Sequence, residues 1–122
     1  MKQKVHSVSY LAKAEFEFKN GVYNLVALPT GAEVVKVSLE IVGDPVVGGS
    51  VSVGFKDETT KDYFLTVTSL QVANNHATSA KDYTATDDKV VVAEVKNAAN
   101  ESDTKGVLRV LYFLPSVIEV EY

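Results

Sequence analysis

The chain has 122 residues, 46% of them hydrophobic, a length typical of one domain built around one core. It contains no cysteine, which excludes disulfide bonds, Cys-ligated zinc, iron–sulfur clusters and a thiol nucleophile. The formal net charge is −4, and no cluster of basic residues is present to neutralise phosphates, so we expect no nucleic-acid partner. We predict a single domain over residues 1–122.

The apolar runs are short. None approaches the roughly 20 residues that a helix needs to cross a bilayer, and no apolar signal-peptide stretch follows the first lysines. We therefore expect no membrane partner and no export signal.

Valine dominates the composition, with 22 valines against two isoleucines, and β-branched residues favour strands over helices. Apolar and polar residues alternate along 35–41, which is typical of a strand with one buried and one wet face. The pattern predicts an all-β protein.

Asn20-Gly21 predicts a two-residue turn, because both residues tolerate positive φ angles. We expect it to join paired strands at about 14–19 and 22–28. In that register Phe18 opposes Tyr23 and Phe16 opposes Leu25, which places the large apolar residues on one face.

Further strands are expected between turns and loops rich in Gly, Pro, Asn, Ser and Asp. Residues 71–87 and 97–105 are expected to be loops. The fold predicted is an antiparallel β-sandwich, jelly-roll-like, of eight or nine strands. The remaining strands are expected at 33–42, 50–55, 62–70, 88–96, 106–114 and 117–122, with a weaker one at 3–10.

The segment 107–114 differs from the other strands because it is apolar on both faces, with Arg109 the exception. One interpretation is a central strand whose second face is covered by a loop. The other is a contact between copies of the chain, since a large uncovered apolar patch is unusual on a monomer. The expected contact residues are Leu108, Val110, Tyr112 and Leu114.

No pattern typical of a catalytic, cofactor or metal site stands out. Residues 43–50 have the spacing of a phosphate-binding loop, but Gly49 occupies the lysine position. His6 and His76 lie in no catalytic or zinc-binding motif, and the acidic runs near 57–62 and 82–88 do not match a calcium loop. We expect no enzyme activity, no cofactor and no bound metal.

Tyrosine rings can stack on sugars, so Tyr63 and Tyr83 are candidate ligand-contacting residues on loops. Core or rim packing is the alternative role for them. A carbohydrate- or receptor-binding module that recognises a surface glycan is therefore a second functional hypothesis.

Three parts of the chain resemble small structural proteins of tailed phages and prophages. A "P-x-G-A" turn precedes a long strand, a glycine-containing strand follows, and an aromatic-rich end closes the chain. The matching segments are 26–37, 51–55 with 62–65, and 106–115 with 119–122.

The resemblance implies a jelly-roll-like virion component, such as a head-decoration, head-fibre or tail-associated protein. It further implies a homo-oligomer, with a trimer favoured, that binds other virion proteins and is found in the host cytoplasm during assembly. It supplies no catalytic residues.

Overall fold

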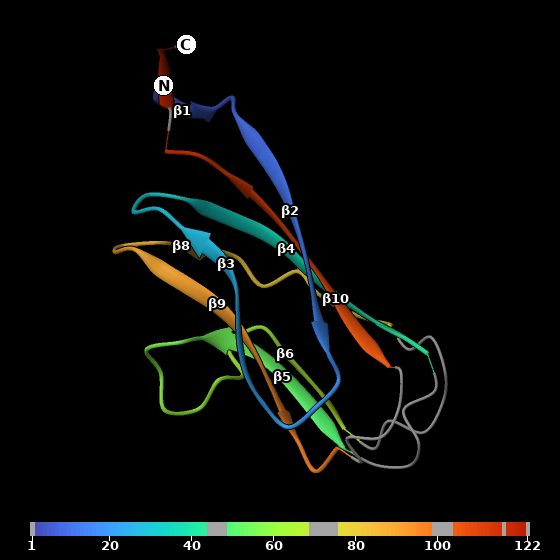
Figure 1. Cartoon of the computed structure of the whole chain (residues 1–122). Coiled ribbons are helices and arrows are strands. Elements are labelled where there is room, and N and C mark those ends of the chain that lie inside the picture. Colours follow the sequence, from blue (N-terminus) through green and yellow to red (C-terminus); the bar gives the residue numbers. More distant parts are fainter. Residues whose placement is uncertain (1, 44–48, 69–75, 99–103, 116, 122) are drawn as a thin grey trace.

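The computed structural model describes residues 2–43, 49–68, 76–98, 104–115 and 117–121. These residues form eleven strands and no helix (Figure 1). Within them, accordingly, there is no apolar helix long enough to span a membrane.

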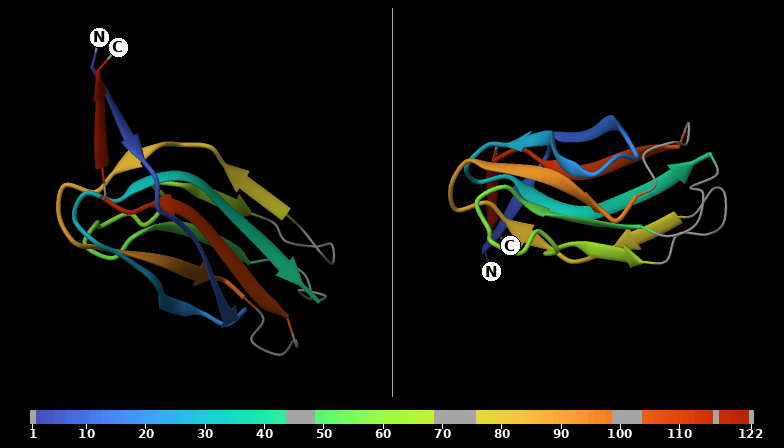
Figure 2. Two further views of the ribbon diagram at one scale, coloured as in Figure 1. Left: turned by 90° about the horizontal axis from the view of Figure 1, so that it is seen from above. Right: turned by 60° about the horizontal axis from the view of Figure 1, so that its bottom comes forward.

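Two sheets pack face to face as layers (Figure 2). The first, called the five-stranded sheet, has the order β2-β10-β4-β7, with β8 also paired to β4. Its strands are β2 (Ser9–Glu17), β10 (Lys105–Phe113), β4 (Glu33–Val42), β7 (His76–Ser79) and β8 (Tyr83–Thr84).

The second layer, the four-stranded sheet, has the order β3-β9-β5-β6. Successive strands cross repeatedly from one sheet to the other, as in a jelly roll. The predicted sandwich class is confirmed. The strands of this sheet are β3 (Gly21–Leu28), β9 (Lys89–Lys96), β5 (Ser50–Phe55) and β6 (Leu65–Thr68).

The core lies between the sheets and is made by alternate residues of each strand. In β5, for example, Val51, Val53 and Phe55 are fully buried, whereas Ser50 and Ser52 face outward. Valine suits this position because its branched side chain fills a pleated surface without losing much rotamer freedom. The same alternation places Val37, Leu39 and Ile41 of β4 in the core.

The expected hairpin around Asn20-Gly21 is wrong. The strands on either side of this corner lie in different sheets, because β2 pairs with β10 and β3 pairs with β9. The large apolar residues still share one core, but they meet across the gap between the layers. Phe16 stacks on Tyr23 with ring centroids 5.4 Å apart.

Contacts from distant segments hold this corner in place. The Phe18 amide donates a hydrogen bond to the Thr104 carbonyl at 3.0 Å, and the Ala98 amide donates one to Asn20 Oδ1 at 2.8 Å. A local turn signal cannot reveal such partners.

The predicted strands at 33–42, 50–55, 88–96, 106–114 and 117–122 agree with the observed boundaries to within one residue, and the last of these is β11 (Val117–Glu121). The weak strand expected at 3–10 is divided between β1 (Lys2–His6) and β2. The expected loop at 71–87 contains β7 and β8, while residues 69–75 lie outside the described part. The strand predicted at 62–70 is observed as β6, which begins at Leu65, and residues 69 and 70 lie outside the described part.

Gly106 lies directly under the Phe16 ring, which is its neighbour across the β2–β10 pair. A Cβ atom at position 106 would clash with that ring. Because Phe16 is only 5% exposed and is held by Tyr23 on its other side, the ring has little room to move.

We expect Gly106→Ala to lower the free energy of unfolding by about 1–3 kcal/mol through this overpacking. Urea denaturation measures the change, with Ser52→Ala on an outward position of β5 as control and an expected effect within about 0.5 kcal/mol. Equal stability of the two variants would show that Phe16 does not cover Gly106.

Candidate functional site

Strand β10 lies at the centre of the five-stranded sheet, between β2 and β4. Its even-numbered apolar residues point into the core: Leu108 and Val110 have no exposed surface, and Tyr112 is 8% exposed. These three side chains are therefore core residues and cannot contact a second copy without unfolding, which corrects their choice as interface residues. Leu114 is half-buried and packs against the same core. Whether another face of β10 contacts a second copy stays a prediction.

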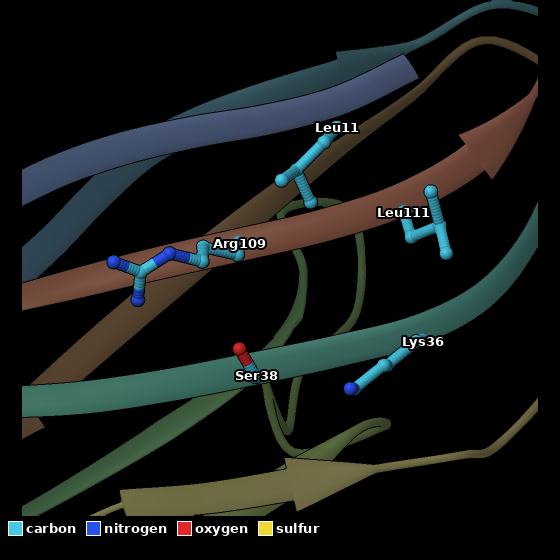
Figure 3. Close-up of a pocket in the computed structure, with 5 residues that line it drawn as sticks. All are labelled: Leu11, Lys36, Ser38, Arg109 and Leu111. Atoms are coloured by element: carbon cyan, nitrogen blue, oxygen red, sulfur yellow. The ribbon is translucent and has the colours of Figure 1, made fainter. Parts of the chain in front are cut away.

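The outer face of β10 carries the odd-numbered residues, and strand register arranges their neighbours in rows across the sheet. Arg109 lies between Lys13 and Ser38. Leu111 lies between Leu11 and Lys36. A hollow of about 290 Å³ lies on this face. Figure 3 shows the side chains that line it, from β2, β10 and β4: Leu11, Lys36, Ser38, Arg109 and Leu111.

Leu11 is the most exposed large apolar side chain among the described residues, at 62%. A second hollow of about 280 Å³, next along the same face, is lined in part by Val35 and Phe113. We call the four residues Leu11, Val35, Leu111 and Phe113 the apolar strip. It faces outward, and no described part of the chain covers Leu11.

Charged residues border the apolar strip. Arg109 Nη1 donates a hydrogen bond to Glu40 Oε1 at 3.0 Å, and both side chains are partly buried. His76 Nε2 of β7 lies 3.8 Å from the other oxygen of Glu40. Glu40 thus connects β10, β4 and the edge strand β7. These contacts fix the sheet at one end of the strip, where Leu11 is exposed and the other three apolar side chains are half-buried.

The outer face of the four-stranded sheet is different in chemistry. Its hollow of about 220 Å³ is lined mainly by hydroxyl and charged groups. The strands contribute Ser50, Ser52, Thr66, Glu94 and Lys96, and the loop after β5 contributes Thr59, Thr60, Lys61 and Asp62. The hollows at the centres of the two outer faces therefore differ in chemistry, although the four-stranded sheet also exposes Val22 of β3.

Tyr63 and Tyr83 are brought together by the fold, with ring centroids 5.4 Å apart. Both also pack on Phe55, at 5.2 and 4.5 Å, and Lys81 Nζ lies 3.9 Å from the Tyr63 ring centre. Both rings therefore pack at the rim of the core and are partly buried. No finding tests their role in glycan contact, which stays a prediction.

Three side chains of types that can bind metal ions, those of Asp57, Asp88 and His6, form contacts within the protein. Asp57 Oδ2 accepts a hydrogen bond from Lys89 Nζ at 2.6 Å, and Asp88 Oδ1 accepts two bonds of 3.0 Å from the amide and hydroxyl of Thr30. His6 Nδ1 lies 3.2 Å from the Leu114 carbonyl oxygen. Among the described residues, no group of three or more His, Asp or Glu side chains is placed to hold a metal ion.

Two signals in the sequence identify the apolar strip. Arg109 shows which positions of β10 face outward, and the odd-numbered apolar residues Leu111 and Phe113 share that face. Leu11 is the one apolar residue among the odd positions of β2, where Ser9, Lys13, Glu15 and Glu17 are polar. Strand pairing then brings Leu11 beside Leu111.

Comparison with solved structures shows a match over the whole chain. A chain in the "acidic stable capsid" structure of Helicobacter pylori bacteriophage KHP30 is 76% identical, with 100% of both chains covered and a TM-score of 0.92.

Two distant matches show the same fold. A chain of the cyanophage Pam1 capsid is 22% identical with a TM-score of 0.65, covering 88% of this chain and 85% of that one. A chain of the Ralstonia phage GP4 capsid is 15% identical with a TM-score of 0.62, covering 90% and 86%. No protein-family model and no curated protein sequence matches the chain significantly.

The Asp57–Lys89 contact generates a prediction for pH dependence. The hydrogen bond from Lys89 lowers the pKa of Asp57 below its ordinary 3.8, and the same bond raises the pKa of Lys89 above 10.5. A lowered carboxyl pKa stabilises the folded state above pH 3.8, and this contribution disappears as the pH falls through the folded-state value.

We therefore expect Asp57→Asn to unfold at lower urea concentration than the wild type at pH 7, with a difference that shrinks toward about pH 2. Urea midpoints across this pH range measure it. A difference that persists unchanged in strong acid would contradict the role of the ionised pair.

Proposed function

Because the chain belongs to the family of bacteriophage capsid proteins that includes the KHP30 capsid chain, we propose that it decorates the phage head as a homotrimer. Family membership makes it a structural component of the virion and not an enzyme. Within the proposal, residues 1–122 act as one domain that is present in the host cytoplasm until the virion is assembled.

Attachment to the head, in preference to a fibre or tail, is supported by the source of the similar chain. The KHP30 chain comes from a capsid structure, and the identity of 76% extends over the full length of both chains. Chains this similar share their fold and most of their surface. The trimeric state comes from the resemblance to phage structural proteins described above.

The observation that carries the proposal is the apolar strip on the five-stranded sheet. Leu11 is 62% exposed, and Leu111 and Phe113 extend the apolar surface along β10. An uncovered apolar surface bordered by charged groups is typical of a protein–protein contact. The opposite outer face carries the hollow lined by hydroxyl and charged groups. We infer that the five-stranded sheet faces the shell and the four-stranded sheet faces solvent.

Surface-glycan binding is the second candidate, and the polar hollow on the four-stranded sheet favours it. This hollow includes Lys61 and Asp62, which precede Tyr63 in the loop after β5. Hydroxyl and charged groups in a hollow are able to form hydrogen bonds with a sugar. Both functions are compatible, because they use opposite faces of the molecule.

We expect Leu11→Glu to weaken binding to capsids assembled without this protein at least tenfold, since a charge would replace roughly 2 kcal/mol of leucine burial. Cosedimentation with these capsids measures the binding. Thr66→Glu introduces the same charge on the outer face of β6 and serves as the matched control, with no effect expected.

Equal binding by the Leu11→Glu variant and the wild type would contradict attachment through the apolar strip. Loss of binding in the Thr66→Glu variant alone, together with glycan binding by the wild type on a glycan array, would favour the polar face as the functional surface.

A further inference from the structure

The dipeptide Asn20-Gly21 lies at the corner where the chain passes from β2 of one sheet to β3 of the other (Figure 1). Both residues are exposed. Asparagine is a thermolabile residue, because its side-chain amide is open to attack by the next main-chain nitrogen. Glycine at the next position has no side chain to obstruct that attack. The sequence therefore places a chemically labile pair at this corner.

Deamidation of such a pair proceeds through a cyclic succinimide. The Gly21 amide nitrogen loses its proton to hydroxide and forms a bond to Asn20 Cγ. The bond from Cγ to Nδ2 then breaks, and the nitrogen leaves as ammonia with a proton from water. Water opens the ring and leaves aspartate or isoaspartate at position 20. The reaction consumes water, releases ammonia and needs no oxidant or reductant.

The fold explains why each member of the pair stands at this corner. Gly21 has a φ of +149°, a conformation that residues with a side chain rarely adopt. Asn20 Oδ1 accepts a hydrogen bond from the Ala98 amide at 2.8 Å, and Asn20 Nδ2 donates one to the Ala98 carbonyl at 3.4 Å. A carboxylate at position 20 would accept the first bond but has no hydrogen to donate in the second. The labile pair is therefore a consequence of the architecture.

We call the two hydrogen bonds between Asn20 and the Ala98 backbone the amide clamp. Ala98 is anchored, because its side chain packs against the core. Asn97, which precedes it, has a φ of 58°, the left-handed conformation of a tight turn. On the other side of the clamp, the Tyr23 hydroxyl donates a hydrogen bond to the Lys19 carbonyl at 2.7 Å and closes the corner. Asn20 is thus exposed to water but fixed at both of its polar atoms.

The amide clamp opposes the first step of deamidation. When the Gly21 nitrogen attacks, Cγ of Asn20 changes from planar to tetrahedral, so Oδ1 and Nδ2 cannot both keep their positions against the Ala98 backbone. The hydrogen bond from Nδ2 also has to break before ammonia can leave. The reaction therefore requires a local opening of the corner, and its rate follows the fraction of molecules that are open.

We propose that Asn20 is a latent deamidation site, which the amide clamp keeps unreactive in the folded protein and which reacts when the corner opens. The modification weakens the corner permanently. In the aspartate product a carboxylate oxygen replaces Nδ2 and faces the Ala98 carbonyl oxygen, so two acceptors meet without a hydrogen between them. This inference does not depend on attachment to the phage head, because it concerns the isolated chain.

We expect Asn20 to deamidate at least about tenfold more slowly in the folded protein than in the protein unfolded in urea, both in the same mildly alkaline buffer. Peptide mapping by mass spectrometry measures the modified fraction over time. Asn24 is the internal control, expected to react slowly in both states because the side chain of Leu25 obstructs the attack.

Equal rates at Asn20 in the folded and unfolded protein would overturn the proposal. A faster rate in the folded protein would overturn it as well, because the Ala98 amide would then stabilise the oxyanion formed during the attack instead of restraining the side chain. This comparison uses the wild-type chain alone and decides the proposal even if a variant fails to fold.

A matched pair of variants at position 97 tests the clamp itself. Asn97→Ala strains the left-handed turn that presents Ala98, whereas Asn97→Gly keeps this conformation without steric cost. We expect Asn20 to deamidate about fivefold faster in folded Asn97→Ala than in folded Asn97→Gly, and equally fast in urea. Equal rates in the folded state would show that protection does not depend on the Ala98 backbone.

Asp57→Asn controls for general loss of stability in the same experiment. It removes the ion pair with Lys89, at the end of β9 opposite to Val95, which is the partner of Gly21. We expect the folded Asp57→Asn variant to deamidate at Asn20 as slowly as the wild type. Acceleration by Asp57→Asn as large as that by Asn97→Ala would contradict a local clamp, because any destabilisation would then have the same effect.

Discussion

Two sheets that pack face to face bury one side of their central strands, and the architecture of this protein depends on that constraint. In β4, β5 and β9 the buried side is rich in valine, and Val37, Val53 and Val91 have no exposed surface. The outward-facing residues are not part of the core, so their chemistry can differ between the two sheets. On the four-stranded sheet the outward side carries a polar hollow together with exposed Val22, whereas on the five-stranded sheet β2 and β10 place leucine and phenylalanine beside arginine and lysine. This difference between the outer faces is the structural feature that the proposed function depends on most directly.

A structural component of a virion has to combine a stable fold with surfaces that bind other subunits. The jelly roll provides stability without a disulfide, because both layers contribute fully buried side chains to one core. The apolar strip belongs to the five-stranded sheet, and contact between this strip and the shell is the proposed binding role.

Alternation in the sequence located the strands well where one face is apolar and the other polar, as in 33–42. It could not identify strand partners, because the pairing of β2 with β10 joins residues 88 to 104 positions apart and leaves no local signal. The short strands β7 and β8 were not predicted, because Ala77, Thr78 and Thr84 are small or polar, whereas typical strands carry large apolar residues. In β10 both faces are apolar, so the alternation of residues does not show which face is buried. Arg109 occupies an outward position, and Leu108 and Val110, at alternate positions, therefore point inward.

Oxidative footprinting of side chains on the capsid-bound protein tests the difference between the two outer faces most directly. The account predicts that oxidation of Leu11 and Leu111 falls strongly when the protein binds capsids, while Val22, 45% exposed on the four-stranded sheet, stays as reactive as in the free protein. Protection of Val22 with unchanged oxidation of Leu11 would contradict the account, because the shell would then contact the wrong sheet.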